Sequence, residues 1–112
     1  MKTETTNATT IEQLPESFKT KWVAALRSGR YNQGFGMMYD PKRDSYDTIG
    51  VAHRIAGVPQ SILSKKKYPT SKHKFLPNML ASEMSPAVEK MISFNDKGLS
   101  FRWIASYIER HM

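Results

Sequence analysis

The sequence predicts a small α+β domain in which a β-hairpin or small antiparallel sheet packs against three to four short helices. Two patterns lead to this class. Near both ends of the chain apolar residues recur every three or four positions, which indicates helices, and near the middle they alternate with other residues, which indicates strands. A chain of 112 residues, of which 39% are hydrophobic, has room for one modest core. We therefore expect a single domain.

The first helix is expected at residues 15–28. Phe18, Trp22 and Leu26 recur every fourth residue, which places three large apolar side chains on one helical face. Gly29 follows, and glycine is the residue type that most often ends a helix. The segment therefore has both a face to bury and a defined end.

A β-hairpin is expected at residues 31–49. In residues 31–40 large apolar side chains alternate with other residues and are expected to share one buried face: Phe35, Met37 and Tyr39. A turn follows at residues 40–44, where a proline presets the backbone angle. Residues 45–49 are rich enough in β-branched and aromatic side chains to form the return strand.

Shorter helices are expected in the second half of the chain. Residues 50–57 lie between two glycines and carry apolar residues at helical spacing, and one further helical turn is expected at residues 60–64. Ser85 followed by Pro86 is typical of a helix start. Residues 95–98 have the composition of a turn.

The final helix is expected to begin after Ser100, which can cap it. Its apolar stripe consists of Phe101, Ile104, Ala105 and Ile108. Trp103 and Tyr107 are also four residues apart but lie on an adjacent face. Together with Tyr31 they are the candidate residues for an aromatic surface that contacts another protein.

The domain is expected to span residues 14–112, preceded by a polar tail at residues 1–13. The tail is rich in threonine and has too few apolar groups to offset the entropy lost on ordering. It also lacks the apolar stretch of a secretory signal, and no run of about 20 apolar residues is present that would span a membrane. We therefore expect a cytoplasmic location and no membrane partner.

The chain is basic because of one segment, residues 61–74. This segment carries five lysines and no carboxylate, and so holds five of the chain's seven net positive charges. A concentrated cation patch attracts polyanions. The candidate residues are the lysines, a tyrosine that can stack on a base, and two neighbouring basic residues, namely Lys65, Lys66, Lys67, Lys72, Lys74, Tyr68, His73 and Arg54.

Other interpretations of the basic segment stay open at this point. A lysine-rich loop can simply be solvated and keep the protein soluble. It can also meet an acidic protein surface instead of nucleic acid. Charge counting alone does not separate these.

Catalytic and metal-binding patterns are weak. The chain has no cysteine, and His53, His73 and His111 do not fall into a nucleophile–base pattern or a metal-ligand spacing. We therefore expect a non-enzymatic protein without a metal or cofactor. If the protein were an enzyme, His53 would be the catalytic candidate, although we expect it on a helix surface or at an interface.

Three segments together resemble a family of small, mostly uncharacterised proteins from bacteriophages and prophages. They are W-x-x-A-L-R-S-G-x-Y-x-Q-G within residues 22–36, the Gly-Val step at residues 49–51, and N-D-x-G-x-S-F-x-x-I-A-x-x-I at residues 95–108. The match covers most of residues 22–108. Family members often carry cysteines on both sides of the Gly-Val step, where this chain has none.

The resemblance implies an origin in a virus or mobile element, and hence a location in the host cytoplasm. Small non-enzymatic proteins of this origin commonly act by binding nucleic acid or by inhibiting a host defence or regulatory protein. The leading hypothesis is therefore an accessory protein whose basic segment binds a polyanion, either nucleic acid or a nucleoprotein complex. The alternative is a protein-interaction module that inhibits a host protein through its aromatic helix face.

Overall fold

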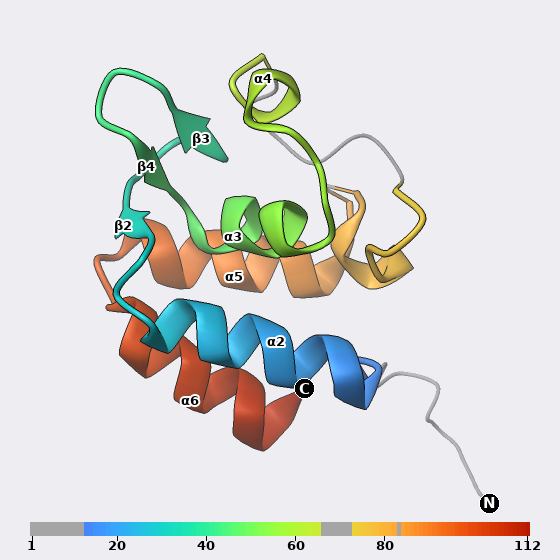
Figure 1. Ribbon diagram of the computed structural model, residues 1–112. Coiled ribbons are helices and arrows are strands. Elements are labelled where there is room, and N and C mark those ends of the chain that lie inside the picture. Colours follow the sequence, from blue (N-terminus) through green and yellow to red (C-terminus); the bar gives the residue numbers. More distant parts are fainter. Residues whose placement is uncertain (1–12, 66–72, 83) are drawn as a thin grey trace, which may run out of the picture.

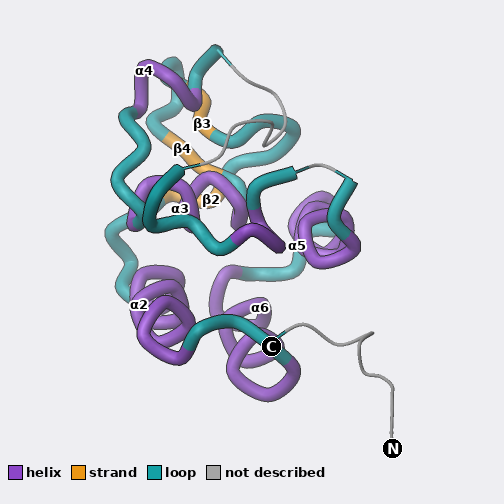
Figure 2. The backbone as a smooth tube through the Cα atoms, turned by 90° about the vertical axis from the view of Figure 1, so that its right-hand side faces the viewer, coloured by secondary structure: helices purple, strands orange, loops and turns teal. Residues whose placement is uncertain are grey.

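The structure, a computed structural model, describes residues 13–65, 73–82 and 84–112 (Figure 1). In chain order its elements are α2 (Glu16–Arg27), β2 (Asn32–Gln33), β3 (Tyr39–Asp40), β4 (Ser45–Tyr46), α3 (Thr48–Ile55), α4 (Gln60–Leu63), the 3₁₀ helix η1 (Asn78–Leu80), α5 (Pro86–Asp96) and α6 (Phe101–His111). Helices α2 and α6 form one layer, and α3 and α5 form a second layer on top of it (Figures 1 and 2). Strands β3 and β4 and helix α4 lie on the far side of the second layer, and β2 lies at its edge beside α3. This is the α+β class that the sequence predicts.

Helices α2 and α6 run in opposite directions and pack along their length (Figure 1). Each buries the apolar stripe expected from its sequence, and the side chains are Phe18, Trp22, Val23 and Leu26 on α2 and Phe101, Ile104, Ala105 and Ile108 on α6. The Leu14 N–H donates to the Met112 carbonyl at 3.0 Å, which joins the start of one helix to the end of the other. Arg27 forms an ion pair with Glu109, with 3.1 Å between the charged groups.

The strands of the sheet are shorter than predicted, and they pair in a different way. Its order is β2-β4-β3; β3 and β4 form the expected antiparallel hairpin, but β2 pairs with β4 in parallel. The prediction that Phe35, Met37 and Tyr39 share one buried face is wrong. Phe35 is 59% exposed and Met38 is buried, because residues 34–38 loop out between β2 and β3 instead of continuing one strand.

The close approach of Gly50 to Met38 explains which methionine is buried. A Cβ atom at Gly50 would overlap the Met38 carbonyl, so only glycine lets α3 pack this closely against the loop. Met38 is therefore held directly against α3 and is only 1% exposed. This contact joins α3 to the loop before β3, and the spacing of apolar residues in the sequence does not predict it.

Helix α3 begins earlier than predicted. Residues Thr48 and Ile49 were expected in the return strand, but they belong to the helix because Asp47 caps it. The Asp47 carboxylate accepts a hydrogen bond from the Gly50 N–H at 2.7 Å. The helix ends at Ile55, two residues before Gly57, the predicted stop, whose φ of 103° is unfavourable for other residues.

The remaining helices match the predictions from the sequence except at one boundary. Helix α4 and the start of α5 at Pro86 are confirmed, and the Ser100 hydroxyl accepts a hydrogen bond from the Trp103 N–H at 3.1 Å, as expected of a cap. The prediction of a turn at residues 95–98 is wrong in its first half. Helix α5 continues through Asn95 and Asp96, and the chain turns only at residues 97–98.

Asn95 is helical because its side chain lies at the centre of a buried polar network. Its Oδ1 accepts hydrogen bonds from the Thr48 N–H at 3.1 Å and from the Thr48 hydroxyl at 2.9 Å. Its Nδ2 donates to the Gly34 carbonyl at 2.7 Å. The Gln33 side chain donates to both Asn95 and the Leu99 carbonyl and accepts from the Phe101 N–H at 3.1 Å. The side-chain amides of Asn95 and Gln33 together thus join β2, α3, α5 and the start of α6.

We expect the change Asn95→Ala to lower the free energy of unfolding by roughly 2–4 kcal/mol, because it leaves several buried donors and acceptors without partners. Chemical denaturation followed by circular dichroism measures the change. The exposed Lys97, two residues further on, supplies the control Lys97→Ala, for which we expect a change within about 0.5 kcal/mol. Equal stability of the two variants would show that the network does not stabilise the fold.

Candidate functional site

The described part of the basic segment consists of its two ends. Lys65 follows α4 and is exposed, and Lys74 is exposed where the chain is described again. Four of the predicted residues, Lys66, Lys67, Tyr68 and Lys72, lie outside the described residues. Their part in a binding surface stays a prediction.

His73 and Arg54 lie near the end of α3. A Cβ atom at Gly57 would come within 3.5 Å of the His73 ring, so the ring packs against the turn that ends α3. His73 Nδ1 also accepts from the Phe75 N–H at 3.3 Å. Arg54 is half-buried, and its Nη1 donates to the Val58 carbonyl at 3.1 Å. Arg54 therefore stabilises the turn after α3, a structural contact that its sequence position did not indicate.

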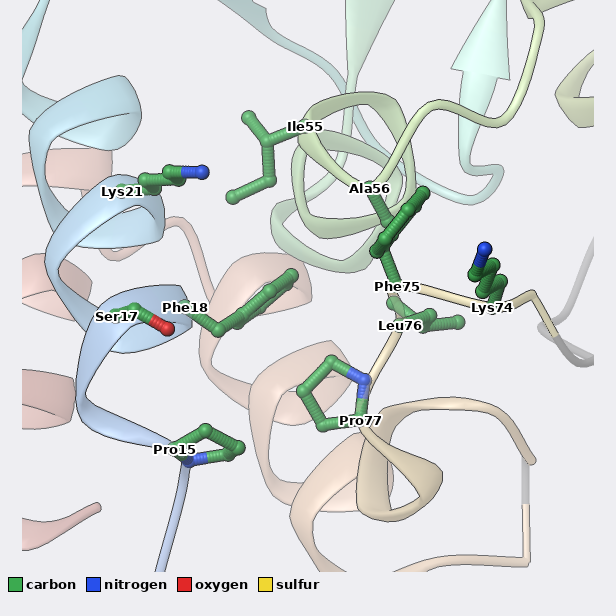
Figure 3. A pocket seen from close by; sticks show the side chains of 10 residues that line it. All are labelled: Pro15, Ser17, Phe18, Lys21, Ile55, Ala56, Lys74, Phe75, Leu76 and Pro77. Carbon is green, nitrogen blue, oxygen red and sulfur yellow. The ribbon is translucent and has the colours of Figure 1, made fainter.

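A groove opens where α2, the end of α3 and residues 74–77 meet, and it has a volume of about 460 Å³ (Figure 3). Its lining is Pro15, Ser17, Phe18, Lys21, Ile55, Ala56, Lys74, Phe75, Leu76 and Pro77. Two lysines belong to this lining, and none of the described residues that form it is acidic. The groove is thus apolar inside and positively charged at its rim.

Phe75 forms an exposed wall of the groove. Its side chain is 65% exposed, and Lys74 Nζ lies 5.2 Å from the centroid of its ring. Figure 3 shows Phe18 on the opposite side, with Lys21 directed toward Ile55. Sequence reasoning found Lys74 but missed Lys21 and Phe75, because Lys21 belongs to a distant helix. The sequence offered one clue to Phe75, which is that this aromatic residue directly follows Lys74.

The predicted aromatic surface forms on α5 and α6, with two additional members. Trp103 and Tyr107 stack with 5.9 Å between ring centroids, and Phe94 meets both rings edge-on at 5.1 and 4.8 Å. His111 lies 4.7 Å from Tyr107. We call Phe94, Trp103, Tyr107 and His111 the aromatic face. Trp103 is 46% exposed although Phe94 and Tyr107 both pack against its ring.

Tyr31 does not join the aromatic face. Its ring meets Tyr46 edge-on at 5.3 Å, and Tyr46 in turn packs against Tyr39 at 4.7 Å. Tyr31 therefore covers the sheet and supports the hairpin. The structure brings together only two of the three residues predicted for the aromatic surface.

His53 is buried, and the expectation of a surface or interface position is wrong. It is 3% exposed, and its Nδ1 lies 2.9 Å from the Ile49 carbonyl. This geometry requires a proton on Nδ1, and Nε2 has no partner among the described residues. Burial lowers the pKa of His53, the hydrogen bond with the Ile49 carbonyl opposes this, and the nearby His73 adds a smaller lowering.

The described residues contain no group of three or more histidines and carboxylates arranged to hold a metal ion. They also contain no helix with the length and apolar character needed to cross a bilayer. Comparison with protein-family models, with curated proteins and with solved structures found no match. The resemblance to phage proteins therefore stays a prediction.

Asp47 has an unusual electrostatic environment beneath the hairpin. Burial raises the pKa of its carboxyl group from 3.8 to about 7. The hydrogen bond from the Gly50 N–H opposes this rise, and the nearby Asp96 adds to it. The folded protein thus binds a proton that the unfolded chain has already lost at pH 5 to 6.

We expect Asp47→Asn to remove a pH dependence of stability without removing the helix cap, because asparagine and aspartate are equally effective at this position of a helix. Since the pKa is higher in the folded state, the contribution of Asp47 is fully present below pH 3.8 and is lost as the pH rises through about 7. The variant should therefore gain stability relative to the unchanged protein between pH 4 and pH 8.

Denaturation of both proteins at several pH values measures the difference between their free energies of unfolding. His53 contributes equally to both proteins, so its contribution cancels in this difference. The full shift corresponds to about 4 kcal/mol as an upper limit. A constant difference across this range would show that Asp47 is ionised throughout.

Proposed function

We propose that the protein is a non-enzymatic accessory protein of phage type that binds a polyanion, either nucleic acid or a nucleoprotein complex. The observation that supports this most directly is the groove, where Lys21 from α2 and Lys74 from the basic segment border one apolar surface without an acidic neighbour in the lining. Lys74 thus belongs both to the charged segment and to a concave surface. A solvated loop without function does not require such a surface.

The charge balance around the segment favours an anionic partner. Among the described residues Arg27 and Glu109 form the single ion pair, so Lys21 and Lys74 have no described carboxylate partner. Ammonium groups that meet the phosphates of a polyanion displace its condensed counterions, and this release drives binding. The lysines of residues 66–72 lie outside the described residues, and by sequence they add to the same charge.

A second candidate function is a protein-interaction module that inhibits a host defence or regulatory protein. The aromatic face supports it, because Trp103 remains 46% exposed while stacked on Tyr107 and packed against Phe94. Rigid aromatic side chains lose little entropy on binding and are common hot spots of protein interfaces. Lys90 donates to the Tyr107 hydroxyl at 3.2 Å and helps to hold this ring in place.

For polyanion binding we expect a labelled oligonucleotide to bind at 50 mM salt and to lose affinity by roughly tenfold or more at 200 mM, as counterion release requires. The triple change Lys65→Ala, Lys66→Ala and Lys67→Ala should weaken binding and flatten the salt dependence. Fluorescence anisotropy measures both effects.

The control removes three positive charges elsewhere, through Lys42→Ala, Arg43→Ala and Lys97→Ala. These three side chains are exposed at the hairpin tip and after α5. Both variants carry the same net charge, so a larger loss in the first localises binding to the segment. No binding at low salt, or equal losses, would contradict the proposal.

For the second candidate we expect a protein captured from host lysate to remain bound at high salt and to be lost with Trp103→Ala. Apolar contacts are not screened by salt, whereas ionic ones are. Phe35→Ala is the matched control, because Phe35 is a similarly exposed aromatic residue on the hairpin side of the molecule. Capture that disappears with salt, or survives the Trp103 change, would rule out the aromatic face as the contact surface.

A further inference from the structure

We propose that the groove beside Lys74 receives one nucleotide of a single-stranded nucleic acid, with its base against Phe75 and its phosphates on Lys21 and Lys74. This inference rests on the proposed function and names its ligand. It combines three observations: the apolar walls, the two ammonium groups and the absence of acidic residues from the described lining.

The apolar walls suit a flat ring. Phe75 is 65% exposed, which is unusual for a phenylalanine in a concave surface, whereas Phe18 on the other side is 8% exposed and belongs to the core. Stacking on Phe75 would remove its exposed area from water. The volume of about 460 Å³ is within the range of small-molecule sites and is sufficient for a nucleotide.

The two lysines lie on different elements and so border the groove from separate positions (Figure 3). Lys21 extends from α2, and Lys74 lies over the Phe75 ring with 5.2 Å between Nζ and the ring centroid. A nucleotide in a strand has one phosphate on the 5′ side and one on the 3′ side of its sugar, and its base projects from that sugar. The arrangement therefore matches a repeating unit that carries an apolar ring and flanking anions.

The groove favours single strands over duplexes. In a duplex the faces of the bases are stacked on one another, so a wall such as Phe75 has no base face to contact. Stacking is also tolerant of sequence, because every base has a π face. We therefore expect binding without strong sequence preference.

An acidic peptide with an aromatic residue is the competing occupant. It also carries an anion and a ring, but it places them irregularly. Nucleic acid supplies both a ring and an anion in every unit. The observations thus favour the nucleic acid.

The test measures affinity for a labelled single-stranded oligonucleotide, the matching duplex and polyglutamate, using the unchanged protein and three variants. Phe75→Ala should weaken single-strand binding about tenfold and duplex binding much less, and Phe75→Trp should retain it. Lys21→Ala should lower the slope of log affinity against log salt by about 0.7. The matched controls are Phe35→Ala and Lys42→Ala, both exposed on the hairpin.

Each outcome decides the inference. Preferential loss of single-strand binding with Phe75→Ala, together with intact circular dichroism, supports it. Salt-dependent binding that Phe75→Ala and Phe35→Ala change equally overturns the nucleotide site while the proposed function stands. No binding of any nucleic acid by the unchanged protein overturns both, and Phe75-dependent binding of polyglutamate alone identifies the occupant as an acidic protein.

Discussion

The side-chain amide of Asn95 holds the two helical layers and the sheet in register. It is 0% exposed and uses both ends of the amide, accepting from Thr48 and donating to Gly34. Gln33 extends the same network to the turn before α6. A buried polar group of this kind is costly in any arrangement that leaves it unpaired, so the network favours one relative placement of the elements. Apolar packing alone would tolerate several relative placements.

This network also connects the three segments on which the predicted resemblance to phage proteins rests. Gln33 and Gly34 of the first segment meet Asn95 and Phe101 of the third. Thr48, directly before the second segment, also donates to Asn95. Trp22 adds to this, because its Nε1 donates to the Thr48 carbonyl at 3.2 Å. The pattern therefore describes how the fold is held together, and it does not locate a binding site.

The two candidate binding surfaces lie outside the fixed positions of that pattern. Lys74 and Phe75 belong to a stretch that the pattern does not include, while Trp103 and Tyr107 occupy its variable positions between buried residues of α6. The structural residues of this fold and its candidate contact residues are thus separate sets. The groove would bind an anionic partner through charge, and the aromatic face would bind a partner through apolar contact. Salt would weaken the first interaction and leave the second largely unchanged.

The sequence by itself determined the helices, because their information is local. The spacing of Phe18, Trp22 and Leu26, the cap at Ser100 and the proline at position 86 each act within a few residues, and all are confirmed. It also located the basic segment and the pair Trp103 and Tyr107, since charge and helical spacing can be read directly.

Tertiary structure alone decided the rest. The two-residue strands are too short to carry a period, and Met38 instead of Met37 is buried because Gly50 admits its backbone. Asn95 is helical instead of in a turn because partners 47 and 61 residues away bind its side chain. The groove needs Lys21 and Phe75 from distant segments. Such contacts depend on which surfaces meet in space, and no window of neighbouring residues contains that information.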